Sequence, residues 1–163
     1  MAAQPGSRHP RLAVLLYSTA TAVYLLDRLT KILAERYLEG RPAIEVIPGV
    51  FHLRYITNPG GAFGLFGGLT WLFVLASLVV VGVILVSSRR LPSATSAVAL
   101  GLVLGGALGN VTDRLIRGPR FSGEVVDFLD FRIWPVFNLA DSAIVVGAIL
   151  LLVTGLRPER AKE

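Results

Sequence analysis

The segment VFNLADSAIVVGAILLLV, residues 136–153, decides the fold class, because about 20 apolar residues form a helix long enough to cross a bilayer. It carries one charge, Asp141, with Asn138 three positions earlier. An ionisable side chain at membrane depth costs roughly 2.5–3.5 kcal/mol on insertion scales, and it persists where it is paired or lines a polar cavity. No basic residue follows Asp141 until Arg157, so the sequence favours a role in lining a site.

Further apolar segments give this chain of 163 residues, 53% of them hydrophobic, the pattern of a multi-pass membrane protein. We predict four transmembrane helices, within residues 12–33, 69–88, 91–112 and 133–156, which places Asp141 about two turns into the last helix. The length suggests one domain, residues 12–156, between a disordered tail at 1–11 and a short tail at 157–163. The first apolar run continues past the small residues at 20–22, so we do not expect a cleaved signal peptide.

A small hairpin is predicted between the first two helices, at residues 43–58. Pro48 and Gly49 favour a turn there, and apolar residues alternate with His52 and Arg54. The segment EVVDFLDF, residues 124–131, is also rich in β-prone side chains. In the third helix small residues recur every four positions, a spacing that lets membrane helices pack closely; they are Gly101, Gly105 and Gly109.

Composition narrows the chemistry that this chain can perform. Its net charge of +5 comes from basic residues that flank apolar helices, so anionic lipid headgroups are a simpler partner than nucleic acid. Cysteine is absent, and histidine occurs only at positions 9 and 52, which leaves serine–histidine catalysis and zinc sites poorly supplied. Carboxylates are therefore the side chains that remain available for catalysis. Counting Lys and Arg on the two sides does not decide the orientation in the membrane.

Four aspartates are predicted to converge on one membrane face. With four spans, the end of the first helix, the end of the third and the start of the fourth lie on the same side. The aspartates there are Asp27, Asp113, Asp127 and Asp141. Three amides accompany them, at Asn58, Asn110 and Asn138, and two of these precede an aspartate by three residues on the same helix face. This pattern predicts a polar pocket that opens at one membrane surface.

Simple structural roles are the alternative for several of these residues. In this alternative, the role of Asp27 is limited to a helix ion pair with Lys31, four positions later. Likewise, Asp113 would form an interfacial salt bridge with Arg114, and Asn58 would be part of a turn without any role in a site. A further aspartate, at position 130, is predicted to be a solvated loop residue.

Two carboxylates that share a site do not both ionise cheaply, so one keeps a proton while the other stays charged. Such a pair can activate a water molecule and protonate an amide, which is the chemistry of aspartic peptidases. Asp127 and Asp141 are the best pair by position, one on a loop and one on a facing helix. The rival hypotheses are a small proton or ion translocator that uses the same aspartates and a scaffold without catalysis. A translocator would need polar residues deeper in the membrane, and a scaffold gives no reason for acids and amides to converge.

At these residues the chain resembles the lipoprotein signal peptidases, the type II signal peptidases of bacteria. Five short motifs occur in the family's order: DRLTK at 27–31, NPGGAFG at 58–64, GNVTDR at 109–114, GEVVDF at 123–128 and FNLAD at 137–141. The resemblance covers residues 25–142. Pro59 is a small departure, at a position where the family varies, and the tail before Arg11 is unmatched.

The resemblance implies an aspartic endopeptidase that needs no metal or cofactor. It removes the signal peptide from prolipoproteins by cutting before a cysteine that already carries a diacylglyceryl group. Carried over position by position, the resemblance implies that Asp127 and Asp141 are catalytic. It implies that the substrate site is lined by Asn58, Asn110, Arg114 and Asn138. Supporting positions are Asp27, Lys31, Gly60 and Asp113.

The resemblance also implies a location and partners. The chain is expected in the bacterial cytoplasmic (inner) membrane with both termini, including residues 157–163, in the cytoplasm. The hairpin then becomes a small extracytoplasmic β-platform at about residues 41–60, and the active site lies near the outer leaflet. The expected partners are prolipoproteins and the lipid bilayer, with no nucleic acid, and the protein is expected to be a monomer.

Overall fold

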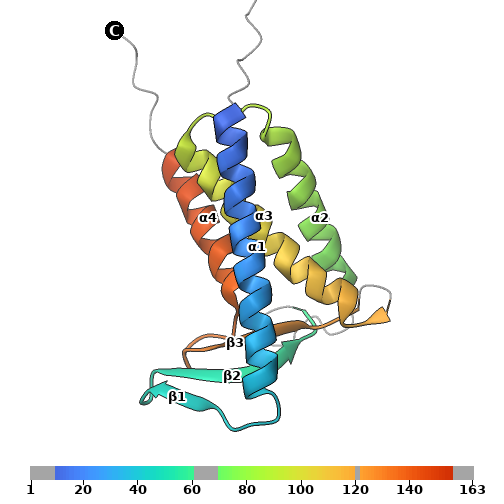
Figure 1. The fold of residues 1–163 in the computed structure, drawn as a ribbon, viewed down its shortest axis with the longest axis vertical. Coiled ribbons are helices and arrows are strands. Elements are labelled where there is room, and N and C mark those ends of the chain that lie inside the picture. Colours follow the sequence, from blue (N-terminus) through green and yellow to red (C-terminus); the bar gives the residue numbers. More distant parts are fainter. Residues whose placement is uncertain (1–9, 61–69, 120–121, 156–163) are drawn as a thin grey trace, which may run out of the picture.

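The computed structural model describes residues 10–60, 70–119 and 122–155, as a bundle of helices with a small sheet at one end (Figure 1). The helices are α1 (Pro10–Leu38), α2 (Thr70–Ser87), α3 (Ala94–Ile116) and α4 (Leu139–Gly155). The strands are β1 (Ile44–Ile47), β2 (Phe51–Asn58) and β3 (Val125–Asp130). The mostly helical part of the predicted class and its small β-element are therefore confirmed, and of the four predicted transmembrane helices three are long enough to span by length and composition.

Three of the described helices, α1, α2 and α3, are long and apolar enough to cross a membrane. The fourth, α4, is a shorter apolar helix of 17 residues. Apolar side chains cover the outer surface of these helices. Val86, Val83 and Leu152, for example, are about two-thirds exposed. Such a surface suits hydrocarbon rather than water.

The centre of the bundle is α3, which packs against α1 on one side and α4 on the other (Figure 1). The predicted glycine spacing serves this packing. A Cβ atom at Gly101 would lie 2.6 Å from the Leu16 carbonyl oxygen, and one at Gly105 would lie 2.5 Å from that of Ala20. Only glycine allows the two backbones this separation, as expected for membrane helices.

The predicted hairpin is present, and β3 joins it to give an antiparallel sheet in the order β1-β2-β3. The sheet is fixed to the end of α1, because Val126 and Phe128 pack against Ala34 and Leu38 in one buried cluster. Asp127, expected on a loop, lies on β3 opposite Ile56 of β2. A strand holds it more firmly than a loop does, because ladder hydrogen bonds fix its backbone.

The start of the last helix differs from the prediction. The apolar residues before it do not extend the helix, because Phe137 pairs with Leu129 through backbone hydrogen bonds of 2.8 and 3.1 Å. The helix begins at Leu139, so Asp141 lies in its first turn and not two turns in. At the other end of the chain, α1 begins at Pro10, two residues inside the predicted tail; residues 1–9 and 156–163 lie outside the described residues.

The prediction that Asp130 is solvated is wrong. It ends β3 opposite His52 and is 3% exposed. Its Oδ1 accepts a hydrogen bond from the Arg132 backbone N–H at 2.9 Å, and its Oδ2 lies 3.4 Å from Arg54 Nε. The contact with Arg132 closes the turn after β3, where Arg132 adopts a positive φ of 66°, and the contact with Arg54 joins β3 to β2.

Candidate active site

Asp141 forms a reciprocal cap with Asn138 at the start of α4. The Asp141 backbone N–H donates to Asn138 Oδ1 at 2.9 Å, and the Asn138 backbone N–H donates to Asp141 Oδ2 at 3.3 Å. This arrangement is a capping box, and the helix dipole also favours a carboxylate in the first turn. The cap explains how an otherwise apolar helix accommodates a negative charge.

Asp127 is held by amides from two other elements and is only 1% exposed. Its Oδ1 accepts a hydrogen bond from Asn138 Nδ2 at 2.7 Å, and its Oδ2 accepts one from Asn58 Nδ2 at 3.0 Å. Asn138 therefore contacts both aspartates, Asp127 through its side chain and Asp141 through the cap. The structure brings together the two carboxylates that the sequence paired.

Asn110 on α3 holds the second oxygen of Asp141. Its Nδ2 donates to Asp141 Oδ1 at 2.8 Å, while its Oδ1 accepts from Lys31 Nζ at 2.9 Å and from Asn138 Nδ2 at 3.2 Å. Each of the three amides predicted for the pocket thus binds one of the paired carboxylates. Their donor atoms face acceptors, which fixes the orientation of both acids.

The two carboxylates line one cavity of about 350 Å³, which the side chains of α2, α3, α4 and the sheet enclose. Its apolar wall includes Phe73 from α2 and Ile144 from α4, and its polar wall includes Arg114. A cavity of this size, mostly apolar with a few convergent polar groups, is typical of a ligand site.

Burial, together with the nearby charge of Asp141, raises the pKa of Asp127 from 3.8 to about 7. The hydrogen bonds from Asn58 and Asn138 oppose this shift but do not cancel it. A carboxyl group with such a pKa is protonated in about half of the molecules at neutral pH. Asp127 can therefore both donate and accept a proton under physiological conditions.

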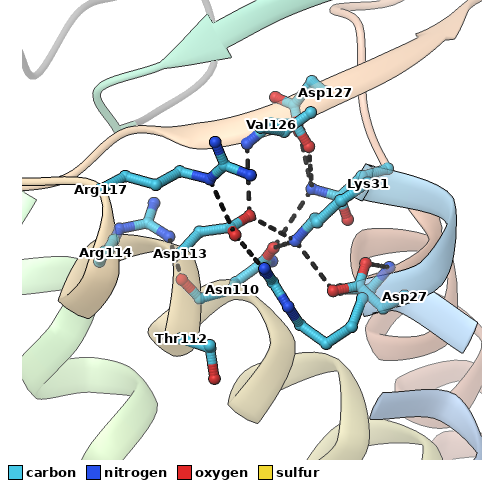
Figure 2. A network of polar contacts seen from close by, with 12 residues as sticks. Asp27, Lys31, Asn110, Thr112, Asp113, Arg114, Arg117, Val126 and Asp127 are labelled. Atoms are coloured by element: carbon cyan, nitrogen blue, oxygen red, sulfur yellow. Dashed lines mark hydrogen bonds and ion pairs between the residues drawn. The ribbon is translucent and has the colours of Figure 1, made fainter. Parts of the chain in front are cut away.

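Behind the cavity, Lys31 connects the two predicted supporting aspartates (Figure 2). It is fully buried, and its Nζ lies 3.0 Å from Asp27 Oδ2 and 2.9 Å from Asp113 Oδ2. Asp27 Oδ1 also accepts the Ala140 backbone N–H at 3.0 Å, in the first turn of α4. The predicted ion pair of Asp27 with Lys31 is present, and it supports the helix that carries Asp141.

Asp113 plays the same part for the strand that carries Asp127. Its Oδ2 accepts the Val126 backbone N–H at 3.4 Å (Figure 2). The predicted salt bridge with Arg114 is wrong: Asp113 pairs instead with Arg28, Lys31 and Arg117. Neighbouring residues on an α-helix point about 100° apart, since a turn holds 3.6 residues.

The side chain of Arg114 lies along the cavity. It is 8% exposed; its Nη1 donates to the Asn110 carbonyl oxygen at 3.3 Å, and its guanidinium carbon lies 5.5 Å from the centre of the Phe73 ring. Within the described part of the chain, its Nε has no hydrogen-bond partner. A buried donor that faces a cavity is suited to an oxygen of a bound molecule.

Sequence reasoning missed three charged residues that brace the site. Arg28 binds Asp113, and Arg117 binds Asp113 through Nε at 3.1 Å. Arg117 also forks onto Glu35 of α1 with hydrogen bonds of 2.9 and 3.1 Å. The i, i+4 spacing of Asp113 and Arg117 was a usable signal, but the partner on α1 lies 82 residues away in sequence.

Comparison with known proteins now defines the family. Residues 19–157 match the Peptidase_A8 family, described as signal peptidase (SPase) II. The chain belongs to the signal peptidase II family. A lipoprotein signal peptidase of Desulfitobacterium hafniense is 45% identical over 92% of this chain and 98% of its own length. One from Rhodococcus jostii is 48% identical over 98% of this chain and 82% of its own length.

Solved structures agree with this membership. A bacterial membrane enzyme determined by the in meso method at 2.3 Å resolution superposes with a TM-score of 0.79 at 27% identity, covering 99% of this chain and 97% of that one. A second, at 1.9 Å resolution, has a TM-score of 0.76 at 27% identity and covers 95% of this chain and 99% of that one. The chain thus shares the fold of these membrane enzymes over nearly its whole length.

In this signal peptidase II chain the start of the NPGGAFG motif, residues 58–60, forms a turn and also serves the cavity. The Gly60 backbone N–H donates to Asn58 Oδ1 at 2.9 Å, while Asn58 Nδ2 binds Asp127, so the two interpretations of Asn58 hold together. Gly60 has φ 134°, and a Cβ there would lie 2.8 Å from the Phe73 ring. Residues 61–64 of the motif lie outside the described residues. Among those described, no three acidic or histidine side chains converge as metal ligands.

Proposed function

We propose that this chain is a membrane aspartic endopeptidase that removes the signal peptide from prolipoproteins, cutting before a diacylglyceryl-modified cysteine. The observation that carries the proposal is the geometry of Asn138, which binds Asp127 and Asp141 at one cavity. The relatives named above are lipoprotein signal peptidases, which supports the same substrate class. In this proposal the two aspartates catalyse the hydrolysis of the peptide bond.

In the proposed reaction the two aspartates start with one proton between them. Asp141, held by the helix N-terminus, is the ionised base and removes a proton from a water molecule, whose oxygen attacks the scissile carbonyl carbon. Asp127, whose pKa is about 7, donates its proton to the carbonyl oxygen. The proton now on Asp141 passes to the leaving nitrogen as the C–N bond breaks. One hydroxyl proton of the tetrahedral gem-diol intermediate returns to Asp127 as the new carboxyl group forms, which restores the pair.

The buried donors around the pair fit the substrate backbone. Arg114 lines the cavity, its Nε has no hydrogen-bond partner among the described residues, and its guanidinium is assigned to a carbonyl oxygen beside the scissile bond. Asn58 and Asn110 keep the carboxylates in place through hydrogen bonds of 3.0 and 2.8 Å. Positioning of reacting groups of this kind is a large catalytic term.

The location follows from the same proposal. The sheet end of the bundle lies at the outer leaflet of the bacterial cytoplasmic membrane, both termini are cytoplasmic, and the protein acts as a monomer. We include α4 as a fourth span: at 1.5 Å per residue its 17 residues reach about 26 Å, close to the roughly 30 Å hydrocarbon core. The single domain comprises α1 to α4 and the sheet, with β1 and β2 as its extracytoplasmic platform.

Cleavage of lipidated and unlipidated substrate tests this function. The purified protein in bilayer nanodiscs is incubated with a diacylglyceryl prolipoprotein and with the same chain lacking the lipid. We expect release of the signal peptide from the lipidated form and at least about a hundredfold slower release from the other, because the bilayer delivers the acylated cysteine to the pocket. Equal rates, or proton flux in liposomes without any cleavage, would contradict the proposal; the second result would favour a translocator.

A further inference from the structure

A second cavity lies against the candidate active site on the exposed side of α4. Its volume is about 480 Å³, and three residues line both cavities: Trp134, Phe137 and Asp141. The rest of its wall is apolar apart from one serine, with Val145 and Val146 continuing it along α4. We call this second cavity the α4 groove.

We infer that the α4 groove holds one acyl chain of the diacylglyceryl group while the modified cysteine lies at the aspartate pair. The inference rests on the proposed function and assigns a binding site for the lipid part of that substrate. Its first support is continuity, because Asp141 borders both cavities and a group attached beside the scissile bond has a direct path between them.

The direction of the groove is the second support. From Asp141 to Val145 the helix rises about 6 Å, at 1.5 Å per residue, away from the sheet and into the apolar part of α4. Val145 and Val146 are 57% and 49% exposed, so the groove floor is open to hydrocarbon rather than covered by another described helix. An acyl chain that hangs from a cysteine at the site runs in this direction.

Aromatic packing makes the groove wall rigid. Phe131 stacks on Phe137 with ring centroids 5.9 Å apart and an angle of 11°, and Phe51 of β2 lies 4.7 Å from Phe131. Ile133 and Trp134 at the rim are 93% and 69% exposed, and tryptophan favours the membrane interface. The groove is therefore preformed by packed side chains, and its opening lies at the level of the lipid headgroups.

The groove acts by positioning rather than by hydrophobic gain. A lipid tail is already in an apolar solvent, so moving it into an apolar groove releases little free energy. Holding it there fixes the cysteine relative to the carboxylates, and a misplacement of about 1 Å can cost about a hundredfold in rate. The prediction is a rate that depends on acyl chain length.

Photocrosslinking tests the site without cleavage. The Asp127→Asn protein in nanodiscs is mixed with a prolipoprotein whose acyl chain carries a diazirine midway along it, and the adducts are mapped by mass spectrometry. We expect adducts concentrated on residues 142–146 and on Trp134, reduced severalfold by excess unlabelled prolipoprotein. Adducts spread evenly over lipid-facing residues of α1 and α2, or insensitive to competition, would overturn the inference and leave only lipid contact.

A steric variant with a matched control gives the second test. Val145→Trp fills the groove, whereas Val153→Trp places the same bulk on an exposed valine of α4 that does not line it. We expect Val145→Trp to lower kcat/KM on a long-chain diacylglyceryl substrate by about 10- to 100-fold but to change it less than about threefold on a two-carbon diacyl analogue. Equal loss in both variants, or on both substrates, would overturn the inference.

The two experiments separate this inference from the proposed function. If the wild-type protein cleaves no prolipoprotein, the proposed function fails; the inferred lipid site then stands or falls on the competition-sensitive adducts alone. If the wild-type protein cleaves and the adducts lie elsewhere, only the α4 groove is wrong.

Discussion

At the scale of single residues, the site combines two acids in different environments. Asp141 lies at a helix N-terminus, where backbone N–H groups favour its charge, whereas Asp127 is buried on a strand beside that charge. The asymmetry assigns the proton to Asp127. Sequence alone could not make this assignment, because it depends on a helix that begins at Leu139 and on a strand register set from β2.

The titration of Asp127 is a direct prediction. The pKa of Asp127 rises from 3.8 to about 7 on folding. The proton bound to Asp127 therefore stabilises the folded state in full below about pH 4, and this contribution to stability is lost as the pH rises to about 7. We expect a carboxylic acid band in infrared difference spectra that titrates near pH 7 and is missing in Asp127→Asn. Cleavage should decline above about pH 7, because the pair loses its shared proton. A band that titrates only below about pH 5 would refute the assignment.

The buried lysine gives a second prediction. Lys31→Met removes the only cation within 3.0 Å of Asp27 among the described salt bridges and leaves that carboxylate uncompensated. We expect a loss of about 3–5 kcal/mol in the free energy of unfolding, as for other broken buried pairs. Thermal unfolding in detergent measures it. Arg36→Met, at an exposed cation on the same helix, is the control and should change the stability by less than about 0.5 kcal/mol.

At the scale of elements, the last helix and the third strand carry the acids, and aspartates of α1 and α3 hold these two elements in place. Asp27 reaches the first turn of α4, and Asp113 reaches β3. The hairpin and the helix cores were predictable from alternation and apolar length. The start of α4 was not, because the pairing of Phe137 with Leu129 overrides the local apolar pattern. The distant partners of Asp113 and Asp130 were missed for the same reason, since Arg28 and Lys31 belong to α1 and Arg54 belongs to β2.

The contribution of the α4 cap to catalysis can be tested separately from its contribution to the stability of the protein. Asn138→Ala removes the hydrogen bonds to Asp127 and to the helix N-terminus, and we expect a loss of about 0.5–2 kcal/mol in stability and at least about a hundredfold loss in kcat. Ser93→Ala removes the N-cap of α3, where Ser93 accepts the Ser96 N–H at 3.1 Å. This control should lose similar stability and keep normal cleavage.

An Asn138→Ala protein that cleaves as fast as the Ser93→Ala protein would show that the cap does not align the acids. Thermal unfolding and single-turnover cleavage on the same preparations provide both readouts.

At the scale of the whole molecule, the bundle places every described buried charge toward the sheet end (Figure 1). The sequence predicted this convergence from topology alone, because four spans return the relevant ends to one side. It could not decide which side of the membrane that is, since basic residues occur on both. Part of this clustering is explained by the supporting network: Asp27 links α1 to α4, and Asp113 links α3 both to β3 and to Lys31 of α1.

The absence of cysteine allows a clean test of sidedness. Glu45→Cys places one thiol on β1, and Arg89→Cys places one in the turn between α2 and α3, at the opposite end of the bundle; both positions are exposed. In spheroplasts we expect a membrane-impermeant maleimide to label position 45 at once and position 89 only after permeabilisation. The reverse pattern would place the aspartate pair at the cytoplasmic face and contradict the proposed location.

We propose above that Asp127 and Asp141 together hydrolyse the bond before a lipidated cysteine. The most direct test of this proposal is mass spectrometry of a diacylglyceryl prolipoprotein after incubation with the wild-type, Asp127→Asn, Asp141→Asn and doubly substituted proteins in nanodiscs. We expect an intact signal peptide and an N-terminal diacylglyceryl cysteine from the wild type only. Each single variant should be folded and at least about a thousandfold slower, and the double variant little worse, because the acids act as a unit. Near-normal cleavage by folded Asp141→Asn or Asp127→Asn would contradict the account.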